Sequence, residues 1–560
     1  MLAAIAIKIE VVAVSRPCRR LLAVATIVMV AMVSFAMLPG AARAAGTGTI
    51  TVGGTVATRY DAYQLFSATV ADDDDADQKV ATDVTWTNDT VRQTVLPVLH
   101  DAGLDSSASS AQEAAEWMNT DGRLTTALTV KLARAICNTG VVSVALNAGT
   151  AAELSCGYWL IVADDAAISQ NEAGTAPIMA LVGGSAVTVK PKAATPKVSK
   201  HVLEDSAAAW QKAADATVAD DLYWRLSATV PAGLTAYDTY TVRFVDTMGA
   251  GLDPSKVAAS MHVYVAAGAD GGFDAVACED GNANSTPSKG WTDITSQCGV
   301  SVDGDTFTVR TGDLIAALGG ADAFAAGARV VAVYNAPLGA NCNRDATKGN
   351  PNEVYLRYSR SPFADQSGDA GFTRTPSDDA TAYTWGLGLI KRSSSDDKFL
   401  AGAKLHITDD RGRTLAADGT WTTNADAYVV SGEDGCVELN GVDAGIYAVE
   451  EIAAPKGYTA FGGKRTVTVA VDGLDVEQVA AAKPKVTVSA ESPLRVDTAD
   501  AGTGSIELSV LNTPSKEASR GFMPSTGDRT LVLVAVLAAI GVAAIVVALV
   551  IKRGDGRREK

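Results

Sequence analysis

Residues 445–461, GIYAVEEIAAPKGYTAF, alternate apolar and polar side chains up to a Pro-Lys-Gly turn. Side chains of a β-strand alternate between its two faces, so Tyr447, Val449 and Glu451 share one face and Glu450 lies on the other. An acid therefore ends an apolar row that is suited to packing against a core. The question this strand raises is which residues would meet a buried carboxyl group.

Two further strands carry a polar residue at the end of an apolar row. Lys391 follows two leucines on one face of a strand that begins near residue 386, and Asn512 ends an apolar row that starts at Ile506. Chance is the plain alternative, because strand ends often carry polar residues. A Lys, a Glu and an Asn at the ends of three apolar rows nevertheless favour a shared buried site.

Residues 386–409, GLGLIKRSSSDDKFLAGAKLHITD, together with 445–461 resemble the Cna-B module, which is named for a collagen adhesin and has a strand ending Glu-x-x-x-Pro-x-Gly-Tyr. The resemblance implies a β-sandwich with an isopeptide bond between Lys391 and Asn512 and with Glu451 as its catalyst. Burial suits this chemistry, because desolvation lowers the pKa of a lysine and yields a neutral, nucleophilic amine. The bond would form once, with release of ammonia, so we expect no enzyme that turns over.

The exported chain contains two more domains by resemblance. Residues 47–70, TGTITVGGTVATRYDAYQLFSATV, resemble the N-terminal domain of sortase-assembled pilins, and 239–254 with 350–362 resemble the isopeptide-forming middle domain of the same proteins. These resemblances imply tandem immunoglobulin-like β-sandwiches, and alternating Val, Thr and Tyr segments separately favour a mainly β chain. One helix is expected at 109–118, SSAQEAAEWM, after its Ser caps. The expected domains are an N-terminal pilin domain at 45–189, a middle domain at 193–380 and a Cna-B domain at 381–515.

In the middle domain the same parity argument finds two of three site residues. Lys200 and Asp246 each lie in an apolar row and supply the expected lysine and acid. Where the pilin pattern Tyr-Ser-Asn places the asparagine, this sequence has Arg360, whose side chain has no carboxamide. Arg360 could instead pair with Asp246 in a salt bridge that is costly to bury, and Asn335 is a distant substitute. The sequence therefore predicts no isopeptide bond in this domain.

The C-terminal region has the three parts of an anchoring signal. Residues 531–551 form an uncharged apolar run that matches the roughly 30 Å hydrocarbon core of a membrane, and the basic tail 552–560 favours a cytoplasmic C-terminus. A plain single-pass anchor fits this run equally well. With MPSTG in the linker 516–530, however, the region resembles the LPxTG cell-wall sorting signal of Gram-positive surface proteins. The resemblance implies cleavage by a sortase between Thr and Gly of the motif Met523, Pro524, Ser525, Thr526 and Gly527, in which Met replaces the usual Leu.

The N-terminus predicts export. Three arginines between residues 16 and 20 precede the apolar stretch 21–38, and PGAARA then gives a small-x-small cleavage pattern. We interpret residues 1–44 as a signal peptide, with Ala44 as the last residue removed. Because the apolar part is long, an uncleaved anchor is the alternative.

A lysine between the first two domains is the candidate for polymerisation. Residues 186–200, AVTVKPKAATPKVSK, contain the linker 190–192, which resembles the pilin motif Val-x-x-Pro-Lys. The resemblance implies that the Lys192 amine attacks the sortase-bound Thr526 of another subunit, with Lys190 as the second choice. An ordinary Lys/Pro linker is the plain alternative.

The cysteines suit an oxidising exterior. All but one of the seven lie in the exported part. Cys342 and Cys436 could form an inter-domain bridge or remain free thiols. Closeness in the chain predicts two local disulfides: Cys137 with Cys156, and Cys278 with Cys298.

Charge and residue content argue against several kinds of function and ligand. The formal net charge of −17 argues against nucleic acid, and four scattered histidines without a recognisable nucleophile argue against an exported enzyme. No cofactor is expected, and the acidic run 72–77 fits no calcium-loop spacing, so no metal is expected either.

The combined resemblance implies the shaft subunit of a covalent pilus, whose partners are a sortase, identical subunits in a head-to-tail filament and peptidoglycan. A monomeric wall-anchored adhesin or a pilus-base subunit is the alternative. The sequence does not identify a host surface ligand.

Overall fold

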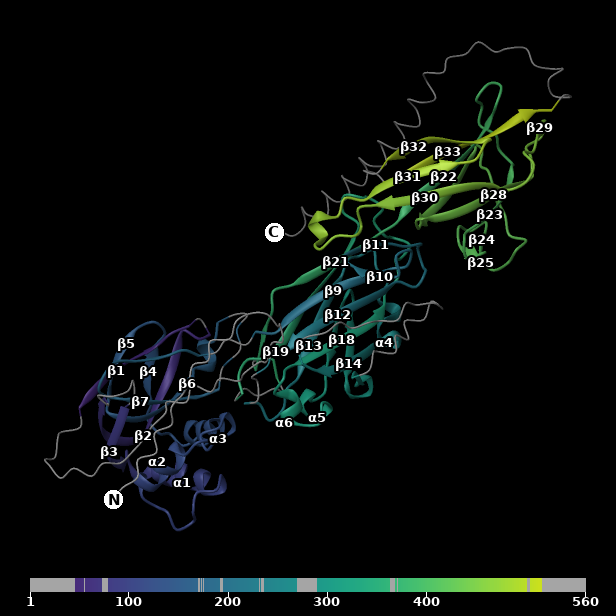
Figure 1. The fold of residues 1–560 in the computed structure, drawn as a ribbon. Helices are drawn as coiled ribbons and strands as arrows, with labels where there is room; N and C mark the ends of the chain where they lie inside the picture. The colour runs from purple at the N-terminus through teal and green to yellow at the C-terminus, as the bar shows by residue number, and fades with distance from the viewer. Residues whose placement is uncertain are drawn as a thin grey trace, which may run out of the picture.

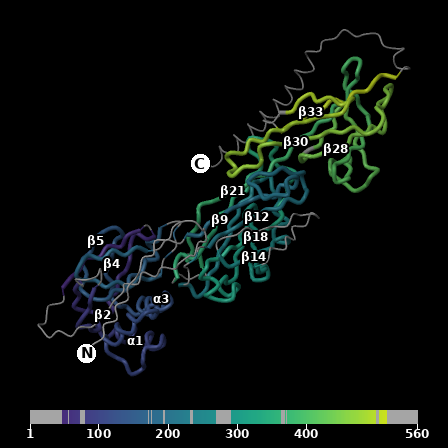
Figure 2. Tube along the Cα trace, in the orientation of Figure 1, coloured from purple at the N-terminus to yellow at the C-terminus, as the bar shows by residue number. Residues whose placement is uncertain are grey.

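In the computed structural model, three β-rich units follow one another along the chain and along the length of the molecule (Figure 1). We call them the N-terminal unit (46–191), the middle unit (195–383) and the third unit (385–515). Figure 2 shows the same end-to-end order in the Cα trace. The structure describes residues 46–515 with the exception of 55, 73–78, 170, 171, 173, 175, 192–194, 231, 233–235, 269–289, 363–367, 370 and 501–503.

The N-terminal unit combines two sheets with a helical segment. Its elements are β1 (Thr47–Val52), β2 (Arg59–Asp72), β3 (Lys79–Trp86), α1 (Asp89–Asp101), α2 (Ala111–Asn119), α3 (Thr126–Cys137), β4 (Val144–Asn147), β5 (Ala151–Ser155), β6 (Gly157–Ala163), β7 (Ile178–Val182) and β8 (Val187–Val189). One sheet has the order β5–β1–β8 and the other β3–β2–β6–β7, with β4 paired to β2. The expected helix is confirmed as α2, where Ser110 and Glu113 form a capping box. The helices α1 and α3 were not predicted.

The middle unit is a sandwich of two sheets. Its elements are β9 (Lys197–Glu204), β10 (Ala209–Gln211), β11 (Ala213–Asp215), β12 (Tyr223–Val230), β13 (Val242–Met248), α4 (Val257–Ser260), β14 (His262–Ala267), β15 (Thr292–Asp293), β16 (Gly299–Asp303), β17 (Thr306–Arg310), α5 (Leu314–Ala317), α6 (Ala321–Phe324), β18 (Ala328–Asn335), β19 (Asn350–Ser359), β20 (Phe372–Arg374) and β21 (Asp378–Tyr383). One sheet has the order β10–β9–β12–β18–β14–β15. The other has the order β11–β21–β19–β13–β17–β16, with β20 paired to β19.

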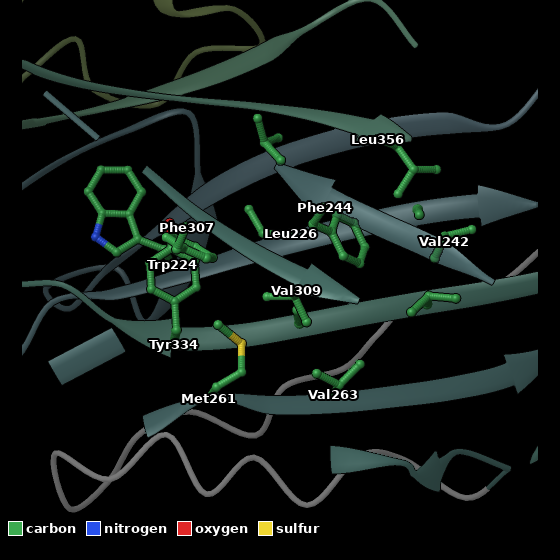
Figure 3. Packing of buried hydrophobic residues seen from close by; sticks show 14 of the residues in the cluster. Trp224, Leu226, Val242, Phe244, Met261, Val263, Phe307, Val309, Tyr334 and Leu356 are labelled. Atoms are coloured by element: carbon green, nitrogen blue, oxygen red, sulfur yellow. The ribbon is translucent and has the colours of Figure 1, made fainter. Parts of the chain in front are cut away.

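Alternating residues of the two middle sheets meet in one core. Trp224, Phe244 and Tyr334 are completely buried there, and Figure 3 shows them with the smaller apolar side chains that fill the space between the strands. The burial of β12 alternates residue by residue, as a strand with one face on a core requires. β21 belongs to this sandwich, so the unit ends at Tyr383, just after the predicted boundary at residue 380.

The third unit is a second two-sheet sandwich. Its elements are β22 (Trp385–Ser393), β23 (Lys404–Thr408), β24 (Thr414–Leu415), β25 (Trp421–Thr422), β26 (Val429–Val430), β27 (Cys436–Val442), β28 (Gly445–Ala453), β29 (Tyr458–Thr459), β30 (Arg465–Asp472), β31 (Lys485–Ala490), β32 (Leu494–Asp500) and β33 (Ser505–Pro514). One sheet has the order β27–β22–β33–β29, with β32 paired to β33. The other has the order β25–β24–β23–β28–β30–β31, with β26 paired to β23. The first and last strands, β22 and β33, are parallel neighbours.

Several expectations concern residues outside the described ranges. These are the signal peptide 1–44, Lys192, Cys278 and all residues from 516 onwards, including the sorting motif and the apolar run 531–551. In the part of the chain that the structure describes, no helix is both long enough and apolar enough to cross a membrane.

The predicted disulfide between Cys137 and Cys156 is wrong, because both residues are free thiols in the structure. Cys137 ends helix α3, where its thiol contacts the Tyr63 hydroxyl. Cys156 is buried between β5 and β6. Cys342 and Cys436 are free thiols as well, which corresponds to the second of the two alternatives considered for them.

Candidate isopeptide sites

The lysine, glutamate and asparagine selected from the third unit meet in its interior. Lys391 lies near the end of β22 and Asn512 near the end of β33, with Lys391 opposite Val510 and Ser393 opposite Asn512. Glu451 comes from β28 in the facing sheet. The side chains of Lys391 and Glu451 are fully buried, and Asn512 is 1% exposed. Strand alternation thus brings three polar residues to one point in an apolar core.

Glu451 Oε1 contacts both of the other two side chains. It lies 3.1 Å from Lys391 Nζ and accepts a hydrogen bond of 2.8 Å from Asn512 Nδ2. Lys391 Nζ also donates to Asn512 Oδ1. The second carboxylate oxygen, Oε2, accepts from the backbone N–H of Phe461 at 3.0 Å, which holds the carboxylate in place. One oxygen therefore touches both the amine that would attack and the amide nitrogen that would leave.

Burial changes the acidity of the lysine. Desolvation lowers the pKa of Lys391 to about 8, although the adjacent Glu451 carboxylate acts in the opposite direction. The Phe461 ring covers the amine, with its centroid 5.2 Å from Nζ. More neutral amine is therefore present near neutral pH than for an exposed lysine, and the neutral amine is the nucleophile.

A second buried lysine–acid pair lies in the middle unit. Lys200 of β9 and Asp246 of β13 come from facing sheets and form an ion pair with both side chains fully buried. Tyr334 Oη accepts from Lys200 Nζ at 2.9 Å and donates to Asp246 Oδ2 at 3.2 Å. Burial lowers the pKa of Lys200 to about 8 and raises the pKa of Asp246. The pair thus has the buried acid and lysine that the sequence predicted there.

Asn352 completes this second cluster and was missed by sequence reasoning. Its Nδ2 donates to Tyr334 Oη at 2.9 Å, and the residue is fully buried. It lies opposite Met248 on β13, one same-face step along that strand from Asp246. The Oδ1 atoms of Asn352 and Asp246 have no hydrogen-bond partner among the described residues. The sequence carried a signal, because Asn352 begins the same apolar row of β19 that leads to position 360.

The suggested pairing of Arg360 with Asp246 is wrong. Arg360 follows β19 beside the N-terminal unit, where its Nη1 donates to the carbonyl oxygen of Asp165 at 3.2 Å. The Arg360 carbonyl accepts from the N–H of Gly174 at 2.6 Å. Asp246 pairs with Lys200 instead. Arg360 therefore connects two units, and the argument that the middle cluster lacks an asparagine no longer holds.

Asn335, the other asparagine considered, is buried itself but belongs to a set whose lysine and acid lie at the surface. Asp221 Oδ1 accepts from Asn335 Nδ2 at 2.6 Å and from Lys256 Nζ at 2.6 Å. These contacts are similar to those around Glu451. The side chains of Lys256 and Asp221 are 47% and 43% exposed, however, so water reaches both.

The two candidate lysines for polymerisation differ in what the structure says of them. Lys190 is exposed just after β8. Lys192 and Thr526, between which the linkage was predicted, both lie outside the described residues.

Among the three units, the third matches a known family model over most of its length. Residues 386–484 match the family model described as SpaA, a prealbumin-like fold domain. The matched range contains Lys391 and Glu451 and ends before Asn512. No curated protein matches the chain.

Solved pilin structures are similar over most of the chain at low identity. The T6 backbone pilin of serotype M6 Streptococcus pyogenes is 14% identical with a TM-score of 0.46, covering 85% of this chain and 99% of that one. The major pilin SpaD of Corynebacterium diphtheriae is 14% identical with a TM-score of 0.41, covering 84% and 98%. The pilus 2b backbone protein of group B streptococcus is 17% identical with a TM-score of 0.38, covering 57% and 99%.

Proposed function

We propose that this chain is a structural subunit of a covalent pilus. The observation that carries the proposal is the buried cluster of Lys391, Glu451 and Asn512, because it would join the first and last strands of a unit through which tension passes. The match of this unit to the SpaA prealbumin-like domain and the end-to-end order of the three units (Figure 1) support the same function.

The proposed reaction is a single acyl transfer within the chain. Lys391 Nζ attacks Cγ of Asn512, so that an Nζ–Cγ bond forms, the Cγ–Nδ2 bond breaks and Nδ2 leaves as ammonia. Glu451 Oε1, which is close to both nitrogens, takes a proton from the attacking amine and gives it to the leaving nitrogen. Glu451 therefore ends in the protonation state in which it began, and no external reagent is consumed.

The bond would lie on the path of the applied force. β22 receives the chain from the middle unit, and β33 leads towards the sorting motif, so tension at the C-terminus would pull these parallel neighbours apart. Without the bond, the backbone hydrogen bonds of the strand pair would carry the load. A link between residues separated by 121 positions would carry it covalently instead.

The middle unit is a second candidate for the same chemistry. Lys200, Asp246 and Asn352 are a lysine, an acid and an asparagine, as in the third-unit cluster, and all three are fully buried. We therefore propose a Lys200–Asn352 bond with Asp246 as the proton carrier, in place of the expectation that this domain has none. Asn352 supplies the carboxamide that Arg360 cannot.

Assembly would use the ends of the chain. In the proposed filament a sortase cleaves after Thr526, joins it to Lys192 of another subunit and finally transfers the filament base to peptidoglycan. The contact is head to tail, so it propagates instead of closing. Residues 1–44 would direct export, and residues 531–551 would hold the precursor in the membrane until cleavage.

An immunoblot of boiled, muramidase-released wall extracts tests the assembly step. Cells with the wild-type chain should give a ladder of high-mass species, and Lys192→Ala should remove it. Lys190→Ala is the matched control and should keep the ladder. If instead only the Lys190 variant loses it, Lys190 is the nucleophile.

A single monomer-sized band in all three strains would overturn the pilus proposal. It would leave the alternative function, a wall-anchored adhesin or pilus-base subunit built from the same domains. The intramolecular bonds would be compatible with that function too, so the ladder is the decisive observation.

A further inference from the structure

A pair of buried acids joins the middle and third units. Asp215 ends β11, and Asp443 lies in the turn between β27 and β28; they are 2% and 8% exposed. The backbone N–H of Ala444 donates to Asp215 Oδ2 at 2.8 Å and to Asp443 Oδ1 at 2.9 Å, which places the two carboxyl groups side by side across the junction. In Figure 1, β11 lies at the end of the middle unit that faces the third unit. Two largely buried acids from different units therefore share one contact, beside a cleft that Asp443 also lines.

The donors around the pair indicate where its proton resides. Asp215 Oδ2 accepts from Trp385 Nε1 at 2.6 Å and from the backbone N–H of Ala444 at 2.8 Å. Both donors belong to the third unit. The Ala444 N–H also donates to Asp443 Oδ1 at 2.9 Å, so Trp385 is the donor that distinguishes the two acids, and it favours an ionised Asp215. Asp443 is therefore the member of the pair that holds the proton and donates it to Asp215.

The backbone on both sides of the pair is tightly packed. The Val218 N–H donates to the carbonyl oxygen of Gly441 at 3.0 Å. Gly441 has φ +79°, and a Cβ at this position would lie 2.1 Å from Val218 Cγ2. Only glycine allows the two units to approach this closely. The orientation of the units is thus set by a close backbone contact next to the acid pair.

Other charged groups face the pair but are differently engaged. Arg411 Nη1 lies 2.8 Å from Asp220 Oδ2, and Arg413 Nη1 lies 2.5 Å from Asp220 Oδ1, so both arginines bind this aspartate. Their guanidinium groups remain charged at any ordinary pH. The remaining titratable groups around the pair are Glu204 at the end of β9 and Asp205 just after it, Asp409 and Asp410 in the β23–β24 turn, and Tyr447 of β28.

We propose that the Asp215–Asp443 contact is a proton-dependent lock between the middle and third units. With one proton shared, the pair holds the two units in a fixed orientation. When that proton is lost, two adjacent carboxylates repel each other in a largely buried site, and the junction opens while each sandwich stays folded. This property goes beyond a role as a pilus subunit, and it does not depend on polymerisation.

The sign of the pH dependence follows from proton linkage. Burial raises the pKa of Asp443 well above its ordinary value and also raises the pKa of Asp215. It raises the pKa of Glu204, which accepts from the Asp215 N–H, to about 7. Acids with raised pKa values bind protons more tightly in the closed junction than in the open one. The lock is therefore complete in mild acid and is lost as pH rises.

Hydrogen exchange on the purified full-length chain tests the lock directly. The N–H groups of Val218 and Ala444 donate across the junction, so their protection reports its opening. After correction for the intrinsic pH dependence of exchange, we expect their protection to fall at least about tenfold between about pH 5 and pH 9. Amides of the third-unit core, such as Val449 in β28, should keep their protection over the same range.

Two variants separate the lock from general stability. Asp443→Asn keeps a donor for Asp215 but cannot ionise, so the loss of protection at its junction amides between about pH 5 and pH 9 should be much smaller than in wild type. Asp410→Asn changes another acid of the cleft that Asp443 lines, outside the pair, and should behave as wild type. Should Asp443→Asn fail to fold, Glu204→Gln with a weakened pH dependence would serve the same purpose.

Three results would overturn the proposal. They are junction amides whose corrected protection does not depend on pH, an Asp443→Asn protein that keeps the wild-type pH dependence, and a loss of protection at Val449 in parallel with the junction. The last result would mean that the whole third unit unfolds and that no separate lock exists.

Discussion

The third and middle units each bury a lysine, an acid and an asparagine, in two different arrangements. In the third unit Lys391 Nζ contacts Asn512 directly, and Glu451 Oε1 contacts both. In the middle unit the Tyr334 hydroxyl accepts from Lys200 and from Asn352. Both lysines are desolvated, so the difference lies in contact. One cluster is arranged for reaction, and the other has a hydroxyl group between its prospective reactants.

The surface set formed by Lys256, Asp221 and Asn335 extends this comparison. It has close contacts to a shared carboxylate oxygen, as in the third unit, but its lysine is 47% exposed. The chain thus contains burial with contact, burial with an intervening hydroxyl, and contact without burial. Burial, direct contact and an intervening hydroxyl group can therefore be tested separately by substitution.

The largest effect is expected for Glu451→Gln, which removes the proton carrier and keeps the size of the side chain. The Lys391–Asn512 bond should not form, so the mass deficit of the wild-type chain should shrink by one ammonia. The free energy of unfolding should fall by roughly 4–5 kcal/mol, by the loop-entropy relation established for disulfides. Intact-mass spectrometry and thermal unfolding of the full-length chain measure both quantities.

Glu450→Gln is the matched control, because Glu450 is the neighbour on the outer face of β28. It should leave the mass deficit and the stability unchanged. A Glu451→Gln chain that still loses this ammonia would show that another group carries the proton.

Asp246→Asn should have the next largest effect. It leaves Lys200 buried without its counter-charge, which typically costs about 3 kcal/mol or more. If the proposed Lys200–Asn352 bond forms, wild type lacks two ammonia molecules by mass and this variant lacks one. A wild-type deficit of only one ammonia would mean that the middle cluster is non-covalent, as the sequence alone predicted.

Local alternation predicted the third-unit site but could not predict the middle one completely. Lys391, Glu451 and Asn512 each end an apolar row, and parity along one strand is enough to place them inward. Asn352 lies near Asp246 only because β19 pairs antiparallel with β13, and the sequence of neither strand alone specifies this pairing. The pilin spacing points to position 360, which lies at the wrong end of β19.

The same limit explains the other errors. Cys137 and Cys156 are close in sequence, but one ends a helix and the other lies in a sheet bend, so closeness along the chain did not mean closeness in space. Helix α1 contains Pro97 in its interior, which argues against a helix on local grounds, yet its apolar residues Val91, Val95 and Leu99 are completely buried. Tertiary packing outweighed local propensity there.

The rate of bond formation in the third unit should rise with pH. The pKa of Lys391 is lowered to about 8, so the neutral fraction of its amine grows as pH approaches that value and is nearly complete above it. Freshly refolded chain should lose ammonia about tenfold faster per pH unit between about pH 6 and pH 8, and then at a constant rate. Mass spectrometry of acid-quenched samples follows the loss. A rate that stays constant below pH 8 would exclude the free amine as the limiting nucleophile.

Tyr334→Phe should have a smaller effect on stability, of about 1–2 kcal/mol, because it removes a hydroxyl that three buried polar groups share. The same change removes the group between Lys200 and Asn352, so any ammonia loss from the middle unit should become faster. Tyr358→Phe is the control, since the Tyr358 hydroxyl is buried in the same core and has no hydrogen-bond partner among the described residues. Slower loss in Tyr334→Phe would mean that the hydroxyl takes part in the reaction.

The smallest effect is expected for Lys256→Met. An exposed ion pair contributes less than about 1 kcal/mol to the free energy of unfolding. Methionine keeps most of the apolar length of the lysine side chain, so the midpoint of thermal unfolding should barely change. The mass deficit should also be unchanged, because solvated Lys256 is expected to form no bond despite its contact with Asp221. If this variant instead retained one more ammonia than wild type, contact alone would be sufficient for reaction. Burial would then explain the stability of the third-unit core but not the formation of its isopeptide bond. The difference in reactivity between Lys391, Lys200 and Lys256 would depend on geometry alone.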